Sequence, residues 1–191
     1  MKNKIFVFLI LITCIFQFAV FAEDSHEKIQ QQSANALVRL GLLKGYGNGD
    51  LGLERKITRA EVAAVIIRMM GYDKNPFKVS SNISFKDLSK KHWAYSAVRM
   101  AASLGYIKGY SNKTFKPSNN ITYAEAISMA VRVLGYGDNL TGKWPNNYIT
   151  KAQSLGLLKN LDVSANKTIT RGDISILVAN SLTVPIKPKT K

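Results

Sequence analysis

The sequence predicts a mainly helical protein made of three helix–loop–helix repeats that pack on one another. Two observations lead to this prediction. A five-residue stretch is written three times, starting at Ile57, Ile121 and Ile169, and each copy precedes a segment with apolar residues at helical spacing. A stretch of the type Gly-Leu-Leu-Lys-Gly-Tyr also recurs upstream of each copy. Because a single unit of this kind cannot bury its own apolar face, we expect the three to pack together.

Residues 1–22 are predicted to be an export signal rather than part of the fold. Lys2 and Lys4 precede the apolar run Ile5–Phe21, and Ala22 offers a small residue for cleavage. A retained membrane anchor is the alternative. Cys14, the only cysteine, lies inside this run, so a processed chain has no thiol for a disulfide, a nucleophile or a metal. We expect a secreted protein that has no contact with the membrane once the signal is cleaved.

The first helix of each repeat is best defined in the second copy. Residues 93–104 place small and aliphatic side chains on one face, and Gly105 is a typical helix C-terminal residue. Trp93 precedes Gly105 by twelve residues, and Trp144 precedes Gly156 by the same twelve. This equal spacing predicts a helix that starts at the tryptophan in both copies.

A glycine-rich loop follows each first helix. In the first copy it reads Gly45-Tyr46-Gly47-Asn48-Gly49-Asp50, and in the second it starts at Gly109-Tyr110 and runs into Phe115-Lys116-Pro117. Glycine and asparagine supply the positive φ angles that such turns need. The third copy is eroded, because Asn160-Leu161 replaces Gly-Tyr and the loop is three residues shorter.

The five-residue stretch closes each repeat with a capped helix. A threonine followed three residues later by an acid, just before an apolar run, is a capping box. The acid reaches back to the cap, so both residues have a structural role. The capping residues are Thr58, Glu61, Thr122, Glu125, Thr170 and Asp173.

The middle residue of the five, which follows the threonine, has no such role. It is Arg59, Tyr123 and Arg171 in the three copies. A guanidinium in the first turn of a helix opposes the helix dipole. A cation kept against that local cost suggests ligand binding, and the alternative is an ion pair with a neighbouring repeat.

Taken in register, these markers resemble the S-layer homology (SLH) domain family. The second repeat supplies the fullest set: Phe85-Lys86-Asp87, His92-Trp93-Ala94, Gly109-Tyr110, Phe115-Lys116-Pro117 and Thr122-Tyr123-Ala124-Glu125. The first repeat supplies Gly45-Tyr46 and Thr58-Arg59-Ala60-Glu61, and the third supplies Trp144 and Thr170-Arg171-Gly172-Asp173. We predict repeats at 23–72, 73–135 and 136–184, with a basic proline- and lysine-rich tail at 185–191 that serves as a linker or a polyanion-binding arm.

The resemblance implies a pseudo-threefold helical bundle that anchors exported proteins non-covalently at the cell wall or surface (S-layer). The implied ligand is an anionic secondary cell-wall polysaccharide, in well-studied members pyruvylated, whose carboxylate the motif arginine contacts. The planar fork of arginine suits a carboxylate, and a tryptophan face can stack on a sugar. The implied ligand-binding residues, with two recurring lysines as supporting charges, are Arg59, Arg171, Asp87, Trp93, Trp144, Lys44, Gly45, Tyr46, Lys108, Gly109 and Tyr110.

Each of these residues also has a structural interpretation. The tryptophans can serve in packing between repeats, Asp87 can cap the segment that follows it, and the Gly-Tyr pairs form loops. The departures from the family pattern matter as well: Ile29 stands where the first repeat would have its tryptophan, and Tyr136-Gly137-Asp138 fits either the start of the third repeat or the end of a helix. We expect as few as one complete site, built around Arg59.

The sequence contains no catalytic constellation. His26 and His92 are the only histidines and do not form a metal-ligand spacing. A phosphate-binding loop and a Gly-x-Ser-x-Gly elbow are both missing. We therefore expect a non-enzymatic protein that needs no cofactor or metal.

The formal net charge of +15 favours anionic partners. Besides the wall polysaccharide, the alternatives are a structural role with other surface-layer proteins, without a sugar-specific site, and charge-driven binding to any polyanion. We expect no specific recognition of nucleic acid.

Overall fold

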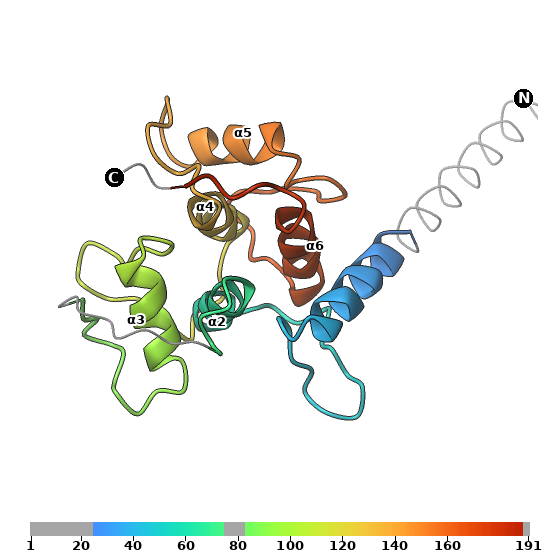
Figure 1. Ribbon diagram of the computed structural model, residues 1–191, viewed down its shortest axis with the longest axis horizontal. Helices are drawn as coiled ribbons and strands as arrows, with labels where there is room; N and C mark the ends of the chain where they lie inside the picture. The colour runs from blue at the N-terminus through green and yellow to red at the C-terminus, as the bar shows by residue number, and fades with distance from the viewer. Residues whose placement is uncertain (1–24, 75–82, 189–191) are drawn as a thin grey trace, which may run out of the picture.

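The computed structural model describes residues 25–74 and 83–188 (Figure 1). The predicted export signal and the last three residues of the tail lie outside these ranges. A helix over residues 25–39, here the N-terminal helix, comes first. It is followed by α2 (Arg59–Met69), α3 (Tyr95–Ser103), α4 (Tyr123–Val133), α5 (Asn146–Ser154) and α6 (Arg171–Ser181). Within the described ranges, no helix is long and apolar enough to cross a membrane.

The helices form three helix–loop–helix units, which confirms the predicted fold class. The N-terminal helix pairs with α2 in chain order, α3 with α4, and α5 with α6. In Figure 1 the motif helices α2, α4 and α6 lie at the centre, with the three first helices around them. The helices α3 and α5 begin two residues after Trp93 and Trp144, so the start predicted at the tryptophan was early.

A closed ring of backbone hydrogen bonds ties the repeats together. The three isoleucines that open the five-residue stretches are fully buried. Ile57 N donates to Ile169 O at 3.3 Å, Ile121 N to Ile57 O at 3.0 Å, and Ile169 N to Ile121 O at 3.0 Å. Each repeat therefore donates to one neighbour and accepts from the other, which is the pseudo-threefold arrangement.

Caps fix the start of each motif helix. Thr58 and Thr122 form capping boxes with Glu61 and Glu125, because each threonine side chain accepts from the glutamate N–H and each glutamate side chain accepts from the threonine N–H. In the third copy Thr170 accepts from Asp173 N at 3.1 Å. The Asp173 carboxylate has one methylene fewer than glutamate and bonds to other residues, described below. Such caps contribute about 1 kcal/mol each.

The helices of neighbouring repeats also pack against one another. The motif helix α2 contacts α3, and α4 contacts α5, so these two motif helices each lie against the first helix of the next repeat. The apolar residues of the three motif helices meet around a space of about 10 Å³, too small and too apolar for ordered water. Its lining includes Val62, Val65, Ile66, Met69, Ile174, Leu177 and Val178.

The stretch Tyr136-Gly137-Asp138 belongs to a helix end. Gly135 has a φ of 83°, and Tyr136 N donates to Val131 O at 3.0 Å. The first repeat closes α2 in the same way, with Gly71 at 73° and Tyr72 N bonded to Ile67 O at 3.0 Å. These are left-handed glycine C-caps, so the question that the sequence left open is resolved.

Candidate functional site

Arg59 is buried inside the loop of the second repeat. The residue is 2% exposed. Its Nε donates to Phe115 O at 2.8 Å, and its Nη2 donates to Lys108 O at 3.1 Å. Its Nη1 pairs with Glu125 at 3.0 Å. Three acceptors from the next repeat thus compensate a cation at the start of a helix.

Arg171 repeats this geometry one step further round the ring. It is 4% exposed and inserts into the loop of the first repeat. Its Nε donates to Leu51 O at 3.0 Å, its Nη2 donates to Lys44 O at 2.8 Å, and its Nη1 lies 3.3 Å from Glu61 Oε1. We call these two contacts between repeats the arginine joints.

Each arginine joint is covered by the tyrosine of its Gly-Tyr loop. Arg171 lies 4.7 Å from the centre of the Tyr46 ring, and Tyr46 OH donates to Glu61 at 3.3 Å. Arg59 lies 4.7 Å from the Tyr110 ring, and burial together with the hydrogen bond to Glu125 raises the pKa of Tyr110 to about 12. Each tyrosine carries a second cation within cation–π distance: Arg55 for Tyr46 and Lys116 for Tyr110.

The third joint contains no guanidinium. Tyr123 OH donates to Asp173 Oδ2, Gln30 Nε2 donates to Asp173 Oδ1 at 2.8 Å, and His26 Nε2 lies 2.9 Å from Oδ1. Burial acts to raise the pKa of Asp173, but these hydrogen bonds outweigh it and hold the pKa below its usual value. The N-terminal helix is in this way attached to α6. We call this contact the tyrosine joint.

One cavity gathers side chains from all three repeats, and we call it groove A. Its volume is about 260 Å³. Lys44 and Arg68 come from the first repeat, Trp93 from the second and Arg171 from the third. Trp93 is 64% exposed, so its face is open to solvent. Arg68 Nη1 donates to Leu42 O at 3.2 Å. The remaining lining residues are Leu43, Glu61, Ala64 and Val65.

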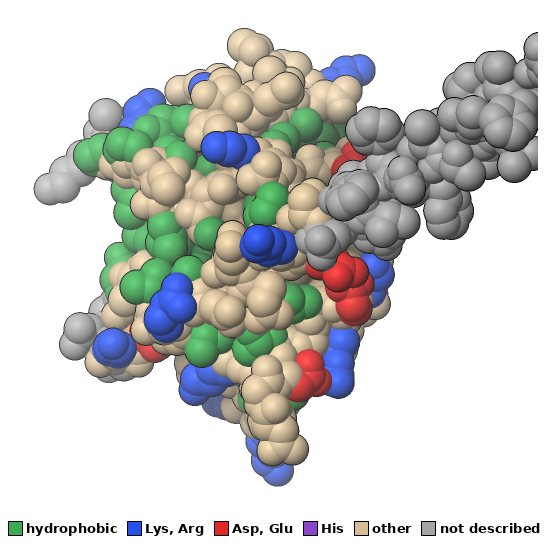
Figure 2. All heavy atoms as spheres, turned by 90° about the vertical axis from the view of Figure 1, so that its right-hand side faces the viewer, with side chains coloured by type: hydrophobic (Ala, Val, Ile, Leu, Met, Phe, Trp, Pro, Cys, Tyr) green, Lys and Arg blue, Asp and Glu red, His purple; other side chains and the backbone are tan. Residues whose placement is uncertain are grey.

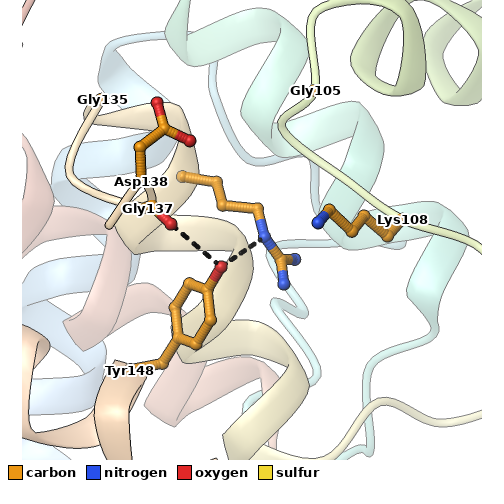
Figure 3. Close-up of a pocket in the computed structure, with 7 residues that line it drawn as sticks. Gly105, Lys108, Gly135, Gly137, Asp138 and Tyr148 are labelled. Atoms are coloured by element: carbon orange, nitrogen blue, oxygen red, sulfur yellow. Dashed lines mark hydrogen bonds between the residues drawn. The ribbon is translucent and has the colours of Figure 1, made fainter. Parts of the chain in front are cut away.

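A second cavity of about 280 Å³ lies one repeat further on, and we call it groove B. Lys108 and Arg132 stand here at the register of Lys44 and Arg68. Arg132 Nε donates to Tyr148 OH at 3.1 Å, and its guanidinium lies over the Tyr148 ring at 4.7 Å. Figure 3 shows Lys108 extending into this space on one side and Asp138 on the other. Gly105, Gly135 and Gly137 complete the lining.

Two other residues predicted from the sequence, Asp87 and Trp144, make hydrogen bonds within the protein. Asp87 accepts from Phe115 N at 2.8 Å and from Lys116 N at 2.7 Å, and burial of the carboxylate is outweighed by these bonds, so its pKa lies below its usual value. Trp144 is 53% exposed and donates through Nε1 to Ser128 Oγ at 3.0 Å.

The glycines of the two Gly-Tyr pairs are needed for loop closure. A Cβ on Gly45 would lie 2.9 Å from Asp50 O, and one on Gly109 would lie 2.7 Å from Thr114 O. The structure thus brings Lys44, Arg171 and Trp93 together in one groove, whereas Arg59 supports the loop that borders groove B.

Sequence reasoning missed Arg68 and Arg132. Both lie in the last turn of a motif helix, where a cation also favours the helix dipole. Each stands ten residues after its capping threonine, and Asn180 holds that register in the third copy. Asn180 Nδ2 donates to Leu157 O and Lys159 O at 3.0 and 2.9 Å. The repeated position was the signal that could have identified both arginines.

Other surface features add little to these grooves. On the face shown in Figure 2, Lys and Arg side chains are spread among apolar and polar ones. In the part of the chain that the structure describes, no group of three or more His, Cys, Asp or Glu side chains could hold a metal ion.

The fold and the grooves define a class of protein: a closed ring of three helical repeats with cationic grooves between repeats. The S-layer homology domain model matches residues 27–63 and 84–127. These two segments belong to the S-layer homology family. The third unit continues the same arrangement of loop, threonine cap and motif helix.

Surface proteins of several bacteria are similar in sequence. A middle cell wall protein of Brevibacillus brevis is 36% identical over 82% of this chain and 15% of its own length. A cell surface protein of Thermoanaerobacter kivui is 34% identical over 78% of this chain and 19% of its own length. A cellulosome-anchoring protein of Acetivibrio thermocellus is 31% identical over 72% of this chain and 33% of its own length. The chain thus matches a third or less of each of these relatives.

Proposed function

We propose that this chain is a non-enzymatic cell-surface anchor that binds an anionic wall polysaccharide in grooves A and B. The S-layer homology domain and the surface-layer, cell-wall and cellulosome-anchoring relatives support secretion to the cell wall or surface and anchoring there. The family resemblance suggests the pyruvylated ligand, and the grooves supply cations that suit it.

The observation that carries the proposal is the composition of groove A. Three cations, Lys44, Arg68 and Arg171, line a cavity that also holds the exposed face of Trp93. Glu61 is the acid in the lining, and it is already paired with Arg171. An anionic sugar suits this surface, because its ring can stack on the indole while its charged group meets the guanidinium and ammonium groups.

The arginines have different roles in this proposal. Three of the five N–H groups of Arg171 are bonded to Leu51 O, Lys44 O and Glu61, so it mainly shapes the groove. Within the described residues, the Arg68 side chain makes one hydrogen bond, to Leu42 O, and can present its other donors to a carboxylate. A ketal-linked pyruvate carries such a carboxylate, and a pyruvylated polysaccharide is the ligand we propose.

Groove B repeats the pair of cations with Lys108 and Arg132. The corresponding residues of the third repeat are Lys159 and Asn180, and the Asn180 amide is bonded to backbone carbonyls. We therefore propose two binding grooves and not three.

The test is sedimentation with purified cell walls that carry a pyruvylated polysaccharide. The double variant Arg68→Gln, Arg132→Gln is expected to bind at least tenfold more weakly, because hydrogen bonds to charged groups contribute about 1.5–3 kcal/mol each. Lys159→Gln is the control at the corresponding position of the third repeat and is expected to bind like the parent. Thermal unfolding of each variant separates lost binding from lost structure.

Two results would contradict the proposal. Equal binding to walls stripped of their anionic groups would favour a structural role without a sugar-specific site. Affinity that collapses with salt and does not distinguish wall polymer from DNA would favour charge-driven binding.

A further inference from the structure

The C-terminal segment 184–188 is docked beside groove B. Val184 packs against the core. Tyr136 OH donates to Pro185 O at 3.1 Å, and Lys187 N donates to Leu134 O at 2.9 Å. The segment thus crosses the C-terminal end of α4, where it satisfies a carbonyl that the helix leaves unpaired.

Gly135 is the residue that permits this docking. It lines groove B and has a φ of 83°. A Cβ at Gly135 would collide with Lys187 O and lie 3.2 Å from the Lys187 Cβ. At the equivalent Gly71 of the first repeat, none of the described residues lies within 4 Å of such a Cβ. Docking of a further segment therefore distinguishes the surroundings of Gly135 from those of Gly71.

We propose that Lys187 is an additional cationic contact for the polyanion, next to the groove B site; this rests on the proposed function. The exposed Lys187 lies against Gly135, which shares the groove with Lys108 and Arg132. Asp138 is the acid in the same lining and opposes part of this charge. Segment 184–188, here called the arm, and groove B together bind a stretch of polymer with more than one negative charge, whereas none of the described residues forms such an arm at groove A.

The experiment places Lys187→Gln in two backgrounds and measures wall binding at low salt. Exposed charge pairs contribute little, so we expect about a two- to fivefold loss in the parent. The same loss is expected in the Arg68→Gln background, where groove B is intact, but no further loss in the Arg132→Gln background. Lys187→Arg should restore binding, and the effect should vanish at high salt.

Three outcomes are decisive. If Lys187→Gln weakens binding no more than Lys159→Gln does, the arm is excluded while the grooves stand. If the loss is the same in both groove backgrounds, the lysine acts through general charge and the coupling to groove B is wrong. If the parent chain does not bind walls at all, the proposed function fails and the arm fails with it.

Discussion

The arginine joint at Arg59 and the tyrosine joint at Tyr123 occupy equivalent places around the ring, yet different groups close them. Arg59 enters the next loop under Tyr110 and pairs with Glu125. Tyr123 meets a shorter acid, Asp173, and the N-terminal helix supplies the other donors to it. One ring thus combines two joints built on buried guanidinium groups with one built on neutral and histidine donors.

Tyr123 and the loop at Asn160-Leu161, the two departures from the repeated pattern, belong to the same joint. Each motif arginine faces the Gly-Tyr loop of the next repeat, so Tyr123 is the motif residue that corresponds to the loop at Asn160-Leu161. In this joint Leu161 stands at the position of the loop tyrosine, and Tyr123 stands at the position of the arginine beneath it. The third joint therefore has neither the loop tyrosine nor the arginine beneath it, and the third repeat also has Asn180 where the other two have Arg68 and Arg132.

The largest expected effect comes from breaking the arginine joints. Arg59→Met and Arg171→Met should each lower the free energy of unfolding by about 3–5 kcal/mol, because two backbone carbonyls lose their charged donor and a partly buried glutamate loses its ion pair. Tyr123→Phe should lower it by about 1–3 kcal/mol, since one hydrogen bond to Asp173 is lost. Chemical denaturation measures all three.

The matched controls are the cations on the outer faces of the loop tyrosines. Arg55→Gln and Lys116→Gln should cost less than about 1 kcal/mol, because both groups are exposed. Equal losses from Arg59→Met and Tyr123→Phe would contradict the distinction between the two kinds of joint.

The tyrosine joint should be sensitive to acid. The pKa of Asp173 is lowered in the folded state, so its contribution is present above the unfolded value of about 3.9 and is lost as the pH falls through the folded value. The stability difference between the parent and Asp173→Asn should therefore shrink as the pH falls below about 4. Urea unfolding at a series of pH values measures it, and a difference that grows in acid would show the sign to be wrong.

The smallest expected effect concerns the acidic residues that line the two grooves. Asp138 lies in groove B, and the lining of groove A has only the acid that its own joint has paired. Asp138→Asn should strengthen wall binding by about two- to threefold at low salt, because a screened charge at a groove rim contributes well under 1 kcal/mol. Weaker binding would instead show that Asp138 accepts a hydrogen bond from the ligand.

The fold followed from the sequence because its signals are local. Threonine and acid three residues apart define the caps, and recurrence in register defines the repeats. The sites were harder to predict, since groove A joins residues that lie far apart in the chain: Lys44, Trp93 and Arg171. Arg59 can be buried because backbone carbonyl groups of another repeat accept its hydrogen bonds. Every residue has such a carbonyl group, so the residue types do not reveal which ones will accept.

The ring of isoleucine hydrogen bonds sets this protein apart from open repeat arrays. In a linear array the end units have a single neighbour, so unfolding can begin by fraying there. Here Ile57 is bonded to both Ile121 and Ile169, so the first and last repeats are also neighbours. Each repeat has two partners and none is terminal. Loss of one repeat would open the ring and leave an unpaired edge on each of the other two, so we expect the three repeats to unfold together.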